Sequence, residues 1–220
     1  AETTASLLKI VFGTLSDKYR KRKIFTVIGY SLSAFTKPLL YFANAWGWVL
    51  TVRVADRIGK GIRTAPRDAL IADSIDKKQR GLAFGFHRAN DTLGAFLGLG
   101  IATFIVWRTQ AQSLELTLPT FQLIVLVSII PGVLAVLVLA LGAVEIEGSG
   151  KTSEMKRLSF REMDARFKYF LFTLILFTLG NSSDAFILLR GQERGLTILG
   201  VMGMSLTFNA IYTIFAGPLG

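Results

Sequence analysis

Hydrophobic residues in this chain are gathered into seven long runs, separated by shorter polar stretches. Most of these runs reach the roughly 20 residues that a helix needs to cross the ~30 Å hydrocarbon core of a bilayer. The first does so only if it begins upstream of this sequence. We therefore expect an all-α polytopic membrane protein with about seven transmembrane helices, near residues 2–16, 24–43, 46–72, 81–107, 121–144, 167–188 and 196–217.

The connectors between these runs predict two units. Residues 44–45 and 189–195 are short connectors, whereas 145–166 is long, polar and charged. We expect a helix bundle over 1–144, a linker over 145–166 and the start of a second bundle over 167–220. A weak echo of the stretch around Gly13 near the end of the chain, around Gly217, fits two similar halves, as in many transporters.

Basic residues lie mostly on one side of the expected membrane helices. Fourteen Lys and Arg fall in 17–23, 73–80 and 145–168, against three in the alternate connectors. Cytoplasmic loops carry such an excess of Lys and Arg. The loops 17–23, 73–80 and 145–166 are therefore predicted to be cytoplasmic.

Composition narrows the classes of function. Among 220 residues, 51% are hydrophobic, the formal charge is +10 and cysteine is absent, so disulfides and thiolate metal sites are excluded. The positive charge lies between apolar runs, which argues against nucleic-acid binding. No HExxH or G-x-S-x-G motif is present and there is one histidine, so we expect no enzyme, no catalytic residues, no metal and no cofactor.

The run at 46–72 is unusual because it carries many charges. With 100° per residue, seven charged side chains fall on one face of this helix. A lipid-facing charge costs about 2.5 kcal/mol or more, so this face must meet protein or water. The seven are Arg53, Asp56, Arg57, Lys60, Arg63, Arg67 and Asp68.

The next run places His87 and Asp91 four residues apart, and therefore on one face. Both lie toward the inner end of their helix, as do Arg63 and Arg67, so pairing between the two helices is expected. Two structural alternatives stay open. Arg63, Arg67 and Asp68 would then only snorkel to the inner surface, or Asp56 and Asp91 would only neutralise nearby arginines.

The charges within the expected helices sum to +4 with His87 neutral, which favours an anionic substrate. Arg53, Arg57 and Lys60 lie nearest mid-membrane and are the candidates for substrate contact. Asp56, His87 and Asp91 are the candidates for proton coupling, because a carboxylate between arginines binds a proton once those arginines are drawn away.

The stretch Gly13-Thr14-Leu15-Ser16-Asp17-Lys18-Tyr19-Arg20-Lys21-Arg22 resembles the G-x-L-[AS]-D-[RK]-x-G-[RK]-[RK] loop between helices 2 and 3 of the major facilitator superfamily, with Arg20 in place of the second Gly. The string Arg57-Ile58-Gly59-Lys60-Gly61-Ile62-Arg63-Thr64-Ala65-Pro66-Arg67-Asp68-Ala69-Leu70 is similar to helix 4 of a prokaryotic subgroup of these permeases. The resemblance implies a fragment of a twelve-helix protein, from the end of helix 2 to helix 8. It assigns Gly13, Asp17, Lys21, Arg22, Arg63, Arg67 and Asp68 to the gate and loop motifs.

The expected function is then secondary active transport of a small solute by alternating access, coupled to protons or another ion. The resemblance implies a monomer in a prokaryotic plasma membrane, with the lipid bilayer, the solute and the coupling ion as partners and no nucleic acid. The alternative is a membrane receptor or scaffold that keeps the fold without transport.

Overall fold

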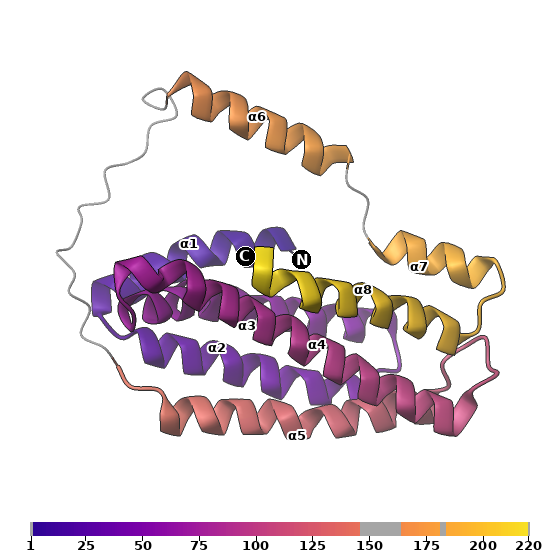
Figure 1. Cartoon of the computed structure of the whole chain (residues 1–220). Helices are drawn as coiled ribbons and strands as arrows, with labels where there is room; N and C mark the ends of the chain where they lie inside the picture. The colour runs from indigo at the N-terminus through magenta and orange to yellow at the C-terminus, as the bar shows by residue number, and fades with distance from the viewer. Residues whose placement is uncertain (1, 146–163, 181–183, 220) are drawn as a thin grey trace.

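The computed structural model describes residues 2–145, 164–180 and 184–219, and these form long helices without strands (Figure 1). The N-terminal helices end close to the predicted boundaries. The α-helices are α1 (Glu2–Tyr19), α2 (Arg22–Thr36), α3 (Trp46–Asp73), α4 (Arg80–Gln110), α5 (Leu118–Gly142), α6 (Ala165–Gly180), α7 (Asp184–Glu193) and α8 (Ile198–Leu219), with 3-10 turns η1 (Lys37–Phe42) and η2 (Lys77–Gln79).

Two predicted runs are subdivided. The run at 24–43 forms α2 and then tightens into η1, where Pro38 occupies the first turn. Proline has no N–H to donate to the preceding turn, so the α-helical ladder ends before it. The run at 167–188 contains α6 and the beginning of α7, and residues 181–183 lie outside the described part.

Hydrogen bonds at the two ends of the bundle show which helix ends lie together. At one end, the Arg22 backbone N–H donates to Glu145, just beyond α5, over 2.7 Å. At the other end, Trp48 Nε1 donates to the Leu39 carbonyl over 2.7 Å, and Gln122 Nε2 to the Tyr41 carbonyl over 3.0 Å. The start of α2 and the end of α5 therefore share one end of the bundle, as the charge pattern predicts.

Helix α3 is held between α1 and α2 at glycine contacts. A Cβ atom built on Gly59 would lie 2.8 Å from the carbonyl oxygen of Gly29 on α2. A Cβ atom on Gly61 would lie 2.6 Å from Cβ of Leu8 on α1. Small residues allow such close backbone approach, which drives helix association in membranes where apolar burial alone does not.

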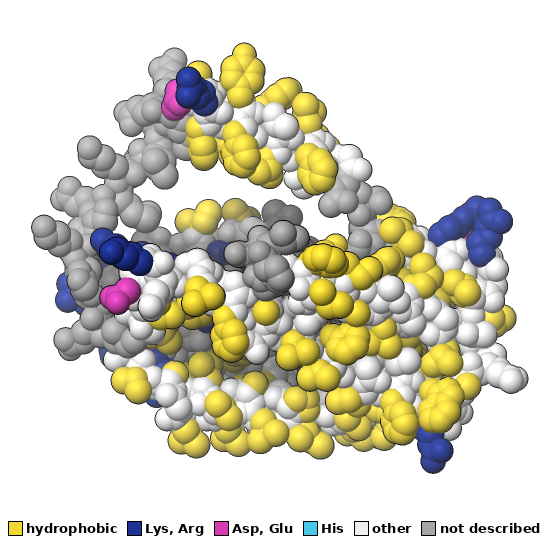
Figure 2. All heavy atoms as spheres, viewed as in Figure 1, with side chains coloured by type: hydrophobic (Ala, Val, Ile, Leu, Met, Phe, Trp, Pro, Cys, Tyr) yellow, Lys and Arg dark blue, Asp and Glu magenta, His cyan; other side chains and the backbone are white. Residues whose placement is uncertain are grey.

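Burial in this molecule is the reverse of that in a water-soluble protein. The buried side chains are mostly small or polar, among them Ser16, Thr26, Ser33 and Thr36. Large apolar side chains face outward over α4, α5 and α8 (Figure 2), and Leu141 is 84% exposed. Such a surface would be unstable in water and is stable in lipid.

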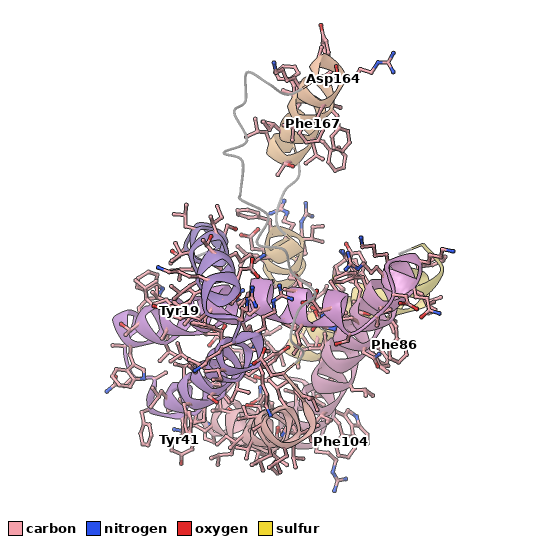
Figure 3. The ribbon with its side chains drawn as sticks, turned by 90° about the vertical axis from the view of Figure 1, so that its left-hand side faces the viewer. Tyr19, Tyr41, Phe86, Phe104, Asp164 and Phe167 are labelled. Carbon is pink, nitrogen blue, oxygen red and sulfur yellow. The ribbon has the colours of Figure 1, made fainter. Side chains whose placement is uncertain are left out.

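Among the described residues, four helical stretches are long and apolar enough to cross a membrane. Helix α3 has 28 residues and is long enough to cross a membrane, but its many charged side chains make it less apolar than these four stretches. Helices α4 and α8 lie side by side, whereas α6, with Phe167, stands away from the bundle (Figures 1 and 3). The four stretches are Lys77–Gln110, Leu118–Gly142, Ala165–Glu193 and Ile198–Phe215. The predicted all-α membrane architecture is confirmed.

Candidate functional site

The N-terminal half of the charged face of α3 carries Arg53, Asp56, Arg57 and Lys60. Arg53 is exposed, and the other three are partly exposed. The Nε atom of Arg57 lies 3.9 Å from the Asp56 carboxylate, at the limit of an ion pair. These four charged residues are therefore at least partly accessible on α3.

Deeper along α3, Arg63 packs against an aromatic ring that the sequence did not single out. The Arg63 guanidinium carbon lies 4.2 Å from the centre of the Tyr30 ring on α2. A cation over a ring face is attracted by the electrons of the ring, by about 0.5–2 kcal/mol. Arg63 Nε is buried and has no hydrogen-bond partner among the described residues.

Arg67, one turn further along α3, also contacts Tyr30. Its Nη1 donates to the Tyr30 hydroxyl over a long 3.5 Å. Its Nε and Nη2 donate to Oδ1 of Asp68, over 3.1 and 2.9 Å. Arg63 therefore contacts Tyr30 of α2, and Arg67 contacts both Tyr30 and Asp68. Tyr30 lies on α2, 33 residues before Arg63 in the chain, and gave no signal in the sequence because only the tertiary contact shows its role.

The expected pairing between α3 and α4 is found as proximity without contact. Arg63 interacts electrostatically with Asp91, and Arg67 with His87. No ion pair or hydrogen bond joins these α3 and α4 side chains in the described part of the chain. His87 is partly buried and Asp91 is exposed, while the neighbouring Phe86 points outward from α4 (Figure 3).

The loop motif forms an ion-pair cluster centred on Arg22. Arg22 Nη2 lies 3.0 Å from Oδ1 of Asp17 at the end of α1. Arg22 Nη1 pairs with Asp73 at the end of α3, and contacts the Ala69 carbonyl over 3.4 Å. Sequence reasoning named Asp17 and Arg22 but missed Asp73, which joins the cluster only because α1, α2 and α3 meet there.

Glu145 adds a second connection at the same end. Its two carboxylate oxygens accept hydrogen bonds from the backbone N–H groups of Arg22 and Lys23, over 2.7 and 2.9 Å. The first N–H groups of a helix have no intrahelical acceptor, and a carboxylate there is also stabilised by the helix dipole. Glu145 thereby caps α2 from a position more than a hundred residues away, a contact that local sequence patterns cannot reveal.

The remaining motif residues have different positions. Gly13 allows close packing of α1 on α3, since a Cβ built on it would lie 3.2 Å from Cβ of Ala65. Lys21 is exposed and forms no ion pair with the described residues. Arg20 has φ of 53°, a left-handed conformation that favours glycine. The resembling motif has glycine at this position, so the turn geometry is kept here without it.

Comparison with known proteins gives the family. The family model of the Major Facilitator Superfamily matches residues 3–220. An uncharacterised MFS-type transporter of Methanocaldococcus jannaschii is 33% identical over 226 residues, which cover all of this chain and 54% of that relative. An uncharacterised protein of Mycobacterium tuberculosis is 35% identical over 97 residues, 44% of this chain and 24% of the relative.

A third relative carries a substrate in its name. The probable 4-methylmuconolactone transporter of Cupriavidus pinatubonensis is 32% identical over 96 residues, 43% of this chain and 22% of that protein. No solved structure matches the chain. The chain spans about half the length of the archaeal relative. These names point to transport and away from an enzyme, and the match over nearly every residue shows that the chain belongs to the Major Facilitator Superfamily.

Proposed function

We propose that the protein containing this chain is a secondary active transporter of a small, anionic solute. The charged face of α3 carries this proposal, because seven charged residues on one face of a helix in an otherwise apolar bundle require water or a polar ligand beside them. Family membership and the transporter names of two relatives support it.

In this proposal the charged residues of α3 and α4 have two roles. Arg53, Arg57 and Lys60 contact the solute. Asp56, on α3, and the α4 pair His87 and Asp91 carry the coupling proton. Asp56 lies beside Arg57, and Asp91 lies within electrostatic range of Arg63. A solute anion that competes with these carboxylates for the arginines links the two fluxes.

The Arg22 cluster has a mechanical role in this proposal. Asp17, Arg22 and Asp73 come from three neighbouring helices of one bundle, and Glu145 ties the end of α5 to them. These contacts brace the bundle so that it moves as one body, as rocking-type alternating access requires. We propose that 1–144 is this rigid unit, that 145–166 links it to a second unit at 167–220, and that the complete protein works as a monomer.

The location follows the charge pattern and the relatives. The relatives come from prokaryotes. We propose a prokaryotic plasma membrane, with 17–23, 73–80 and 145–166 in the cytoplasm, where basic loops are retained.

The test is solute-dependent proton movement in vesicles that contain the full-length protein. A pH-sensitive dye would report proton flux after addition of pools of organic anions, cations or neutral compounds, with 4-methylmuconolactone included because of the named relative. We expect flux with the anion pool, and Asp91→Asn should abolish proton movement while Arg108→Lys, at the far end of α4, leaves it intact. A protein that binds solutes but moves none in any pool would be the receptor or scaffold instead.

A further inference from the structure

Two arginines on α3 share one aromatic residue on α2. Tyr30 lies under the Arg63 guanidinium at 4.2 Å and its hydroxyl accepts the long contact from Arg67. Arg63 and Arg67 are four residues apart, so their side chains leave the helix one above the other, with Cβ atoms about 5–6 Å apart. The ring and the helix together hold two guanidinium groups side by side.

These guanidinium groups have hydrogen-bond donors that nothing in the described chain satisfies. Arg67 directs two of its nitrogens to a single oxygen of Asp68. The Nε atom of Arg63 is buried and has no hydrogen-bond partner among the described residues. A cation–π contact attracts the charge but accepts no N–H bond in the guanidinium plane. Buried donors are almost always paired in proteins, so this Nε is available to a bound acceptor.

The charge around the pair selects the ligand. Arg63 and Arg67 contribute two positive charges and the adjacent Asp68 removes one, since its carboxylate is paired with Arg67 at 2.9 Å. Asp56 and Asp91 also interact electrostatically with Arg63, whereas Asp68 is the carboxylate in direct contact with the pair. The surplus of about one charge suits a monoanion, because a second negative charge would be left unpaired away from bulk water.

The depth of the pair suits a solute site. Arg63 precedes the end of α3 at Asp73 by ten residues, or about 15 Å along the helix axis. It is therefore well inside the bundle from the Arg22 cluster, which lies at that end. A guanidinium binds a carboxylate through two parallel N–H···O bonds, and such a bond pair is both strong and directional.

We propose that Arg63, Arg67 and Tyr30 form a subsite for the carboxylate of a small monocarboxylate. The inference rests on the proposed transport function and identifies its substrate class. Tyr30 keeps the Arg63 guanidinium in place, and Arg67, held by Asp68, adds a second cation beside the bound carboxylate. Arg53, Arg57 and Lys60 then contact the rest of the solute.

Equilibrium binding to the full-length protein in lipid nanodiscs tests the subsite. The probes are radiolabelled acetate, propionate, lactate and benzoate, with benzamide as the neutral analogue of benzoate. Inorganic phosphate, used at alkaline pH where it is mainly the dianion, is the competitor. At least one monocarboxylate should bind, and neither benzamide nor phosphate should displace it. Arg63→Lys and Arg67→Lys should each weaken binding about tenfold or more, because an ammonium group cannot form the two parallel bonds.

Two further variants keep the result interpretable. Tyr30→Phe keeps the ring under Arg63 and removes only the hydroxyl, so it should weaken binding several-fold while the protein stays folded. Arg108→Lys makes the same chemical change in the last turn of α4, outside the subsite, and this variant should bind as the wild type does. Binding by no monocarboxylate, unchanged binding in both folded lysine variants, or equal displacement by phosphate would each overturn the subsite. Solute flux that persists in the two lysine variants would overturn the subsite alone, whereas carboxylate binding without any flux would overturn transport alone.

Discussion

Replacing Gly29 by alanine should separate α2 from α3. An alanine Cβ at this position would lie 2.6 Å from Cβ of Arg63 and 2.7 Å from both the Arg63 nitrogen and the Gly59 carbonyl oxygen. Ordinary contacts begin near 3.4 Å, so the helices must move apart by up to about 0.8 Å. Two of the three obstructing atoms belong to backbone, which cannot yield by a rotamer change.

The size of the effect follows from two opposing contributions. Overpacking a close contact typically costs about 1–3 kcal/mol. Alanine in a helix interior is more favourable than glycine by about 0.5–1 kcal/mol, which offsets part of that loss. We expect a net destabilisation of about 1–2 kcal/mol, or a fall of about 3–6 °C in the apparent Tm for a chain of this size.

The assay is thermal unfolding of the purified protein in detergent, followed by circular dichroism at a fixed scan rate. Gly47→Ala is the matched control, because a Cβ at Gly47, in the first turn of α3, meets nothing within 4 Å. Gly59→Ala disturbs the same contact from the other side, so the double variant should lose less than the two single losses combined. An apparent Tm for Gly29→Ala equal to that of Gly47→Ala would refute the close packing of α2 on α3.

The other predictions concern the end of the bundle near Arg22. Arg20→Gly should raise stability by about 1 kcal/mol, because glycine adopts the φ of 53° at Arg20 without Cβ strain; an unchanged or lower Tm would contradict that turn. Glu145→Gln should lower stability by about 1–2 kcal/mol, since an amide keeps one acceptor and loses the charge that caps α2, and Glu115→Gln, at the opposite end, should have no effect in the same melt. Asp73→Asn should weaken the Arg22 cluster and increase hydrogen exchange at the start of α2; exchange equal to that of the wild type would remove Asp73 from the cluster.

The family, through the motif from Gly13 to Arg22, and the membrane-spanning architecture were predictable from the sequence because their signals are local. Apolar runs of membrane length and the excess of basic residues in alternate connectors depend only on neighbouring residues and on lipid as the solvent. The same holds for the charged face of α3, since helix periodicity alone places Arg53 and Arg67 within one stripe. The structure keeps this face and groups the ends of the helices as the charge pattern required.

The partners of those charges depended on the tertiary structure. The sequence predicted that Arg63 and Arg67 pair with His87 and Asp91 on α4, because opposite charges at similar depth suggest pairing. The structure turns them toward Tyr30, because Gly29 and Gly59 bring α2 so close to α3 that its aromatic ring reaches the guanidinium groups first.

The sequence by itself determined that this chain crosses a membrane, how its connectors alternate, and that one helix carries charge along a single face. Those properties depend on hydropathy and on helix periodicity, and both can be read from residues that are close together in the chain. Only the tertiary structure decided that Arg22 joins Asp17 to Asp73, and that Glu145 caps a helix that begins 123 positions earlier. Such contacts depend on which helix ends meet in space, and helix packing through small residues sets that arrangement without leaving a periodic signal in the chain.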